Sequence, residues 1–436
     1  MSHHRGWTAL ACSSIAVVLL AAAPASARAQ DLEQRVQELE AKVDEMEKEK
    51  KASGVEFDPK KLRIESADGQ HSIRVGGRLM IDGLIANEDG SDDARIGDGS
   101  EIRRARIFLE GKVYGDWEYK GQFDFAPGDE VEVKDAYIRY AGLDRSRITL
   151  GHYKEPFSLE ELTSSKYITF MERAMPVEAF APSRNLGIGA NTYGAVMNGT
   201  WTGGLGFFGE GFDDNGSDDE GYGIAGRLTV APIAEKTRTV HFGGSFEYRD
   251  SNDDEEVRFR ARPEMHATST RLVDTGTITD AKNTTKWGIE ATGVYGPFSV
   301  QGEYIGTSVD RSGGSDPDFS GWYAYGSYFL TGESRAYSTK TGAFGRVKPA
   351  RNFDPFNGGG PGAWEVGVRF SSIDLSDSSI RGGEEDNLTV GVNWYVNPQI
   401  RFMANYVQVL DLDKTGDPLL DGSEPGGFQL RAQVDF

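Results

Sequence analysis

Arginines recur at every second position along several apolar stretches of the chain, a spacing that would gather positive charge on one side of a strand. Arg104 and Arg106 alternate with Ala105 and Ile107. Alternate side chains of a β-strand point to opposite faces, so the two arginines would share the face opposite the apolar one. Guanidinium groups stay charged and form paired hydrogen bonds with oxyanions. A row of them predicts a path for anions.

The same alternation occurs in other segments, and it defines a larger set of candidate residues. Arg258, Arg260 and Arg262 alternate with apolar residues at 257, 259 and 261. An arginine that faces lipid near the middle of a membrane costs roughly 2–4 kcal/mol, so a membrane-spanning strand would turn such residues inward. By this parity we predict a shared lumen lined by Arg74, Arg78, Arg104, Arg106, Arg227, Arg258, Arg260, Arg262, Arg369, Arg401 and Arg431, and Arg249 has the same parity.

Carboxylates on the lumen side leave a second interpretation open. Glu110, Asp124, Glu247 and Glu290 are predicted to face the lumen with the arginines. Ion pairs between the two groups would cancel much of the positive field. We favour the anion path, with neutralised pairs as the alternative.

The last strand of the chain indicates which kind of sheet would position the arginines. Residues 428–436 alternate between apolar and polar without a break and finish on Phe436. This pattern is typical of a transmembrane barrel strand, which has one face against lipid and the other toward water. A half-buried strand of a soluble sheet would show the same alternation.

The first residues favour the membrane interpretation. Residues 1–29 combine Arg5, an apolar run from Trp7 to Ala23 and a small-x-small site at 27–29, a pattern typical of a cleaved signal peptide. Nothing later approaches the roughly 18 consecutive apolar residues of a membrane helix, so a spanning structure would be a barrel. The only cysteine, Cys12, lies in the signal, so no disulfide is expected in the mature chain.

A helical stalk is predicted between the signal and the barrel, over residues 30–52. Leu32, Val36, Leu39, Val43 and Met46 recur at alternating four- and three-residue spacing, as in a short coiled coil. A solvated single helix is the alternative. Residues 53–70 are predicted to be a linker, and the stalk would lie in the periplasm.

Residues 71–436 are predicted to form the barrel domain. Strand patterns there are separated by short turns, such as 114–116, and by long loops rich in Asp and Gly, such as 87–100. This asymmetry is typical of outer-membrane barrels. We predict an all-β fold, a 16-stranded antiparallel transmembrane β-barrel. Eighteen strands are possible, because residues 268–276 and 331–362 are ambiguous.

One long connection stands out because it lacks alternation for more than thirty residues after a predicted strand at 147–153. It contains Ser158-Leu-Glu-Glu161, a helix start with a capping pattern. A connection of this length is usually functional. We predict that it folds into the barrel as a constriction loop, whose basic candidates are Lys154, Lys166, Arg173 and Arg184.

Several of these segments resemble the phosphate-selective porin O and P family of Gram-negative outer membranes. The resemblance covers roughly residues 60–436, and it rests on GHYKEPFSLEELTSSKYITFMER at 151–173, IRRARIFLEGKVYGDWEYKGQFDFA at 102–126, KDAYIRY at 134–140, and LTGESRAY with GAFGRVKP at 330–349. It implies a homotrimer of sixteen-stranded barrels and an arginine ladder that passes phosphate or pyrophosphate. It also implies a basic inward loop, with Lys154 and Lys166 as its basic members.

These expectations together describe an outer-membrane porin with a water-filled, anion-preferring channel for passive diffusion of phosphate or related oxyanions. The expected partners are small anions, outer-membrane lipid and lipopolysaccharide, and other copies of the chain. A general diffusion porin, or a structural anchor for the stalk, are the alternatives. The net charge of −21 argues against nucleic acid as a partner. No enzyme activity, metal or cofactor is expected, because no nucleophile or metal motif includes His71, His152, His241 or His266.

Overall fold

The computed structural model describes residues 34–42, 54–58, 62–87, 96–126, 128, 130–209, 221–251, 256–414 and 420–436. The predicted signal peptide, residues 1–29, lies outside the described residues. Part of the predicted stalk is a helix over residues 34–42, and its Val36 and Leu39 are 46% and 61% exposed. Its association into a coiled coil stays a prediction. Among the described residues, no helix is both long and apolar enough to cross a membrane.

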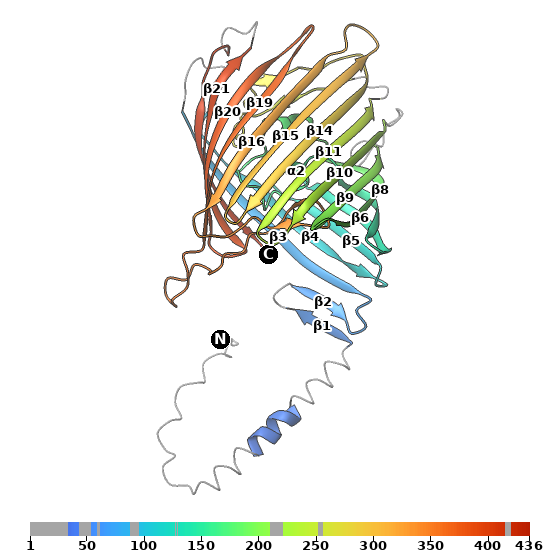
Figure 1. Cartoon of the computed structure of the whole chain (residues 1–436), viewed down its shortest axis with the longest axis vertical. Helices are drawn as coiled ribbons and strands as arrows, with labels where there is room; N and C mark the ends of the chain where they lie inside the picture. The colour runs from blue at the N-terminus through green and yellow to red at the C-terminus, as the bar shows by residue number, and fades with distance from the viewer. Residues whose placement is uncertain are drawn as a thin grey trace, which may run out of the picture.

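A closed antiparallel barrel of sixteen strands dominates the structure (Figure 1). This confirms the predicted fold class and the count of sixteen. The strands, each paired with its neighbour, are β3 (Ser72–Asn87), β4 (Gly99–Val113), β5 (Trp117–Asp124), β6 (Glu132–Leu143), β7 (Ser146–Lys154), β8 (Arg184–Val196), β9 (Gly199–Phe208), β10 (Gly223–Ala234), β11 (Arg238–Asp250), β14 (Ala281–Tyr295), β15 (Phe298–Arg311), β16 (Asp318–Phe329), β19 (Ala363–Asp377), β20 (Ile380–Tyr395), β21 (Ile400–Asp413) and β22 (Gly426–Asp435).

The final strand closes the barrel with the parity that its sequence predicts. β22 pairs with β3, and Arg431 lies opposite Asp82 in the register. Phe428 and Leu430 are 41% and 50% exposed on the outer face, whereas Arg431 is 2% exposed. The apolar positions of the barrel therefore form its outer, lipid-facing surface, and the polar positions line the interior.

The segment predicted as a linker, residues 53–70, is partly a hairpin. Strands β1 (Val55–Asp58) and β2 (Arg63–Ser66) pair with each other, and β2 continues the sheet onto β3. The hairpin lies outside the closed barrel (Figure 1). Within the predicted linker, the residues of both strands are therefore bonded to a neighbouring strand.

The prediction of a membrane-spanning strand that carries Arg258, Arg260 and Arg262 is wrong. The connection between β11 and β14 instead carries two short strands, β12 (Arg260–Ala261) and β13 (Val273–Asp274), which pair only with each other. Phe259 and Ala261 are 5% and 0% exposed. The apolar face of this segment therefore packs toward the barrel interior, which leaves the three arginines on the other side.

Two connections from the same end of the barrel fill much of its interior. Residues 155–183 carry α2 (Leu159–Leu162) and α3 (Met175–Phe180), and residues 251–280 pack against them. Phe180 contacts Phe259 with their ring centroids 5.7 Å apart. Residues 155–183 form the inward loop that the sequence predicts, and they are called the constriction loop below.

A third connection enters the barrel from the opposite end, where the chain also terminates. Residues 330–362 link β16 to β19 and carry the short pair β17 (Tyr337–Ser338) and β18 (Ala343–Phe344). Phe344 and Val347 are 4% and 8% exposed. We call residues 330–362 the second insertion. Its length departs from the short turns expected at this end.

Candidate functional site

The constriction loop is fastened at its start by a cap from its own sequence and by a carboxylate from the barrel wall. Ser158 Oγ accepts a hydrogen bond from the Glu161 backbone N–H at 3.1 Å, as the capping pattern predicts. Glu303 of β15 accepts hydrogen bonds from the Leu159 and Glu160 backbone N–H groups at 3.0 and 2.7 Å. The first turn of α2 thus donates to a wall residue, because the first N–H groups of a helix have no partner within it.

Three of the predicted lumen arginines hold the loop against the wall rather than lining open space. Arg401 donates to the Ile168 and Thr169 carbonyls at 2.8 and 3.0 Å. Arg369 donates to the Glu172 carbonyl at 3.0 Å and pairs with Glu264 at 2.5 Å. Arg431 lies within 2.6 Å of both Asp82 and Glu172. All three face inward as parity predicts, but each is buried by the constriction loop.

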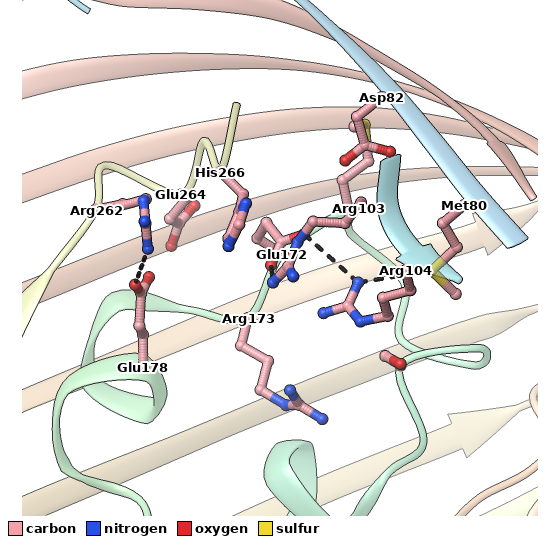
Figure 2. A network of polar contacts seen from close by, with 12 residues as sticks. Met80, Asp82, Arg103, Arg104, Glu172, Arg173, Glu178, Arg262, Glu264 and His266 are labelled. Carbon is pink, nitrogen blue, oxygen red and sulfur yellow. Dashed lines mark hydrogen bonds and ion pairs between the residues drawn. The ribbon is translucent and has the colours of Figure 1, made fainter. Parts of the chain in front are cut away.

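Arg103 joins the same network, and parity does not predict it. A β-bulge at this position lets Ile81 pair with Ile102 while Met80 pairs with Arg104. The extra residue turns its side chain inward, where Arg103 donates to both carboxylate oxygens of Glu172 at 2.9 Å (Figure 2). The sequence does carry a signal for this bulge, namely two consecutive arginines in a spanning strand. Without a bulge, one of the two would face lipid.

The loop leaves an open cavity along the other side of the lumen. Its volume is about 510 Å³, and its walls come from β3 to β10, the constriction loop and the second insertion. Cations dominate the lining, since the carboxylates among the lining residues are Asp135 and Glu161 alone. The lining cations are Arg78, Arg103, Arg104, Arg106, Lys120, Lys134, Arg139, Arg145, Arg147, Lys154, Arg173, Arg184, Arg227 and Lys340.

Some of these cations have no carboxylate partner among the described residues. Arg78 is 9% exposed and donates to Ser165 Oγ at 2.6 Å, with no acid within ion-pair distance. Arg147 and Lys340 likewise form no ion pair within the described part of the chain. Arg104, in contrast, has a distant carboxylate partner in Glu172 at 3.8 Å, but its buried Nε forms no hydrogen bond with any described residue. The cavity therefore keeps charge that the protein does not neutralise.

Other cations form ion pairs with carboxylates, so the alternative interpretation, in which acids neutralise the arginines, holds for part of the lumen. Arg106 contacts Asp124 at 2.6 Å, and Arg227 contacts Glu290 at 2.5 Å. The remaining expected acids are also engaged, in the pairs Arg74 with Glu110 and Arg249 with Glu247. The acids Asp124 and Glu290 are 3% and 5% exposed and are not among the residues that line the cavity. The arginines that pair with these two acids, Arg106 and Arg227, do line the cavity.

Three of the four predicted constriction residues line the cavity, and the fourth, Lys166, does not. Lys154, Arg173 and Arg184 line the cavity. Arg173 contacts Glu161 at 3.0 Å, and Arg184 contacts Asp135 at 2.7 Å. Figure 2 shows that Arg173 points away from its neighbour Glu172. Lys166 does not line this cavity. It faces a small cleft with Arg346 and Asp435, and it lies 3.6 Å from Asp435.

The arginines of residues 258–262 lie away from the cavity. The Arg258 side chain is 45% exposed and pairs with Asp274 at 2.5 Å. Arg260 is exposed on β12. Arg262 donates to the Thr268 carbonyl at 2.9 Å and reaches Glu178 of α3 at 3.4 Å (Figure 2). Arg74 also faces inward but lies outside the cavity, over the ring of Phe108.

Comparison with known proteins agrees with this architecture. Residues 73–436 match the sequence model of the family described as phosphate-selective porin O and P. The chain belongs to this family. It is 28% identical to Porin O of Pseudomonas aeruginosa over 413 residues, which covers 86% of this chain and 91% of that protein. It is 31% identical over 383 residues to an uncharacterized protein of Caulobacter vibrioides, covering 84% of this chain and 75% of that protein.

Solved porins share the fold of this family member at low sequence identity. OmpF of Salmonella typhi, in a complex with daunomycin, superposes with a TM-score of 0.51 at 11% identity, over 85% of this chain and all of that one. A loop-deletion mutant of OmpT from Vibrio cholerae also gives 0.51 at 11% identity, over 84% of this chain and all of that one. The family and the barrel together identify the protein as an outer-membrane porin.

Proposed function

We propose that this porin is an anion-preferring channel through which phosphate or related oxyanions diffuse passively. The observation that carries the proposal is the excess of cations over carboxylates in the cavity beside the constriction loop, where Arg78 and Arg147 have no acid partner among the described residues. A low-dielectric wall strengthens the field of such charges over a narrow path. Cations would be repelled there, and anions would be concentrated.

The spread of the charges favours movement of an anion over tight binding. The lining cations extend from Lys154 and Arg184, at the level of the loop, to Arg145, in the turn that joins β6 and β7. Several weak sites in series let an ion enter and also leave. Guanidinium groups such as Arg78 offer paired donors that suit the oxygens of phosphate.

The acidic loops at the external end do not remove this preference. The Debye length at physiological salt is about 8 Å, so loop carboxylates farther than this from the cavity are largely screened. The local charges of the lining then decide the sign of the preferred ion. We also propose, from family membership, that the chain assembles as a homotrimer in contact with lipid and lipopolysaccharide, with the stalk in the periplasm.

A general diffusion porin is the second candidate, and specific ion pairs favour it. Arg106 with Asp124 and Arg227 with Glu290 remove part of the field. If the remaining cations are too few, the channel would discriminate by size more than by charge.

Reversal potentials across a planar bilayer separate the two candidates. With a potassium chloride gradient, the proposal predicts a potential set mainly by chloride, and phosphate added on one side should reduce the chloride current by competing for the same cations. A potential set by potassium would contradict the anion preference. Anion preference without phosphate competition would support an anion channel that has no preference for oxyanions.

A further inference from the structure

The second insertion reaches from the constriction to the outer surface of the barrel. Its inner part is fixed beneath the constriction loop, where the Phe344 backbone N–H donates to Thr163 Oγ1 at 3.3 Å. Phe344 packs with Leu159 of α2, and Arg346 pairs with Asp435 of the final strand. Val347 is then the last buried residue before the segment leaves the lumen. Residues 348–360 extend past the barrel rim at the end where the chain terminates (Figure 1).

Outside the lumen, the segment lies against aromatic residues of the lipid-facing surface. The Phe353 ring meets Trp394 of β20 edge-on at 5.0 Å between centroids. Trp394 stacks in turn on Trp364 of β19 and on Phe402 of β21, at 5.4 and 5.7 Å. Both indole N–H groups donate to the Pro361 carbonyl, at 3.2 and 2.9 Å. The rings therefore form one apolar aromatic cluster, in which both indole N–H groups are already hydrogen-bonded within the protein.

Phe356, next along the segment, has no aromatic neighbour in the part of the chain that the structure describes. It is 92% exposed, the most exposed large apolar residue of the described chain. Its position is nevertheless fixed, since the backbone N–H groups of Phe356 and Asn357 both donate to Asp354 Oδ1, at 3.1 and 3.0 Å. A phenylalanine held outward beside an aromatic girdle matches the depth at which a barrel meets the lipid headgroups.

Two cations precede Phe353 and Phe356 in the same segment. Lys348 and Arg351 are exposed, and neither forms an ion pair with any residue that the structure describes. Asp354, the acid between them and Phe356, is occupied by the backbone and by the Asn357 amide. The surface thus combines apolar rings with free positive charge, which is the pattern that binds anionic lipid at an interface.

We propose that residues 348–360 dock onto the periplasmic leaflet of the outer membrane, with Phe356 inserted among the lipids and Lys348 and Arg351 bound to anionic phospholipid headgroups. The second insertion then connects the leaflet to the constriction, because its inner part contacts the constriction loop through Phe344 and Arg346. This inference depends on the barrel and its lipid-facing surface, and it is independent of which ion the channel prefers.

Depth-dependent fluorescence quenching tests the docking. A single cysteine replaces Phe356, with Cys12 changed to serine, and carries an environment-sensitive fluorophore in vesicles that contain phosphatidylglycerol with brominated acyl chains. Phe57→Cys is the matched control, since Phe57 is also an exposed phenylalanine, 61% exposed, on the hairpin outside the barrel. The proposal predicts stronger quenching by bromine and weaker quenching by aqueous iodide at 356 than at 57. Equal quenching at both positions would overturn it.

Charge reversal tests the headgroup part separately. Lys348→Glu and Arg351→Glu each change the charge by two units, so each should lower the ratio of docked to undocked segment about thirtyfold in phosphatidylglycerol vesicles. In vesicles of phosphatidylcholine alone, the same variants should behave like the parent protein. If quenching at 356 is unchanged by both reversals, the segment does not recognise anionic lipid. The heat-dependent mobility of the barrel on gels verifies that each variant is folded.

Discussion

Arg103 and Glu172 are joined by two parallel hydrogen bonds of 2.9 Å, which connect a bulge in the barrel wall to the constriction loop. Glu172 also pairs with Arg431 at 2.6 Å and lies 3.8 Å from Arg104. One buried carboxylate therefore balances guanidinium groups from both sides of the β22–β3 seam. This places the loop against the wall and leaves the opposite side of the lumen open.

Replacing this carboxylate should destabilise the barrel. Glu172→Gln leaves Arg103 and Arg431 with less compensating charge in a buried place, and breaking a buried ion pair costs about 3–5 kcal/mol. We expect a lower thermal unfolding midpoint in detergent. Glu235→Gln is the control, because Glu235 pairs with Arg238 in an exposed turn, where a pair is worth about 1 kcal/mol or less. Equal shifts for both variants would show that Glu172 has no special structural role.

Removing unpaired cavity charge should weaken the preference for anions. Arg78→Gln and Arg147→Gln each delete a cation without freeing a carboxylate. A unit charge at 7 Å in water attracts a passing anion and repels a passing cation by about 0.6 kcal/mol each, so each variant should lower the anion-to-cation permeability ratio about sevenfold. Reversal potentials measure this ratio. Arg258→Gln, outside the cavity, should leave it unchanged. A drop of the same size in that control would show that cations outside the cavity contribute as much as those that line it, and would contradict the assignment to the cavity.

The wall carboxylate that caps α2 should control the mobility of the constriction loop. Each Glu303 carboxyl oxygen accepts one backbone N–H, from Leu159 or Glu160, and Glu303→Gln turns one of these oxygens into an NH2 donor; a hydrogen bond of this kind is worth about 0.5–1.5 kcal/mol. Hydrogen exchange at these two amides should become about tenfold faster. Glu365→Gln is the matched control, since Glu365 is 1% exposed and bonds to side chains of the wall. It should leave both amides unchanged.

Gly99 of β4 should be essential for stability, whereas Gly83 of the neighbouring strand β3 should not, because another backbone segment approaches Gly99 closely. A Cβ on Gly99 would lie 2.2 Å from the Ala267 carbonyl oxygen, so Gly99→Ala must push residues 251–280 away from β4. Such overpacking costs about 1–3 kcal/mol. Gly83 faces open space, with nothing within 4 Å of the added carbon. Thermal unfolding should therefore shift for Gly99→Ala and not for Gly83→Ala, and the reverse order would contradict the packing of this loop.

Local patterns were enough to predict the elements of this protein and the direction of many side chains. The inward position of Arg431 follows from strict alternation in β22, and the cap by Ser158 follows from four consecutive residues. The barrel of sixteen strands follows from repeated alternation and from the turns between strands. These features depend on interactions between near neighbours in sequence, or on a two-residue period that every spanning strand must keep because one face meets lipid.

Parity alone fails where the chain leaves the regular barrel. Arg103 turns inward because of a bulge, and a bulge breaks the two-residue period. Arg258, Arg260 and Arg262 alternate as a spanning strand would, yet residues 251–280 pack inside the barrel, since Phe259 and Ala261 are buried there instead of facing lipid. A strand needs apolar residues at every second position whether that face packs against another segment of the protein or against lipid. The alternation therefore cannot distinguish the two.

The sequence by itself determined that arginines gather inside an outer-membrane barrel, because a charged side chain has no stable place on the lipid face. Only the tertiary structure decided what each arginine does there. Arg369, Arg401 and Arg431 bind the constriction loop, whereas Arg78 and Arg147 lie at the cavity surface and form no ion pair with a described carboxylate. The division depends on which wall the loop rests against, and that is set by contacts between residues more than a hundred positions apart, such as Glu303 with Leu159.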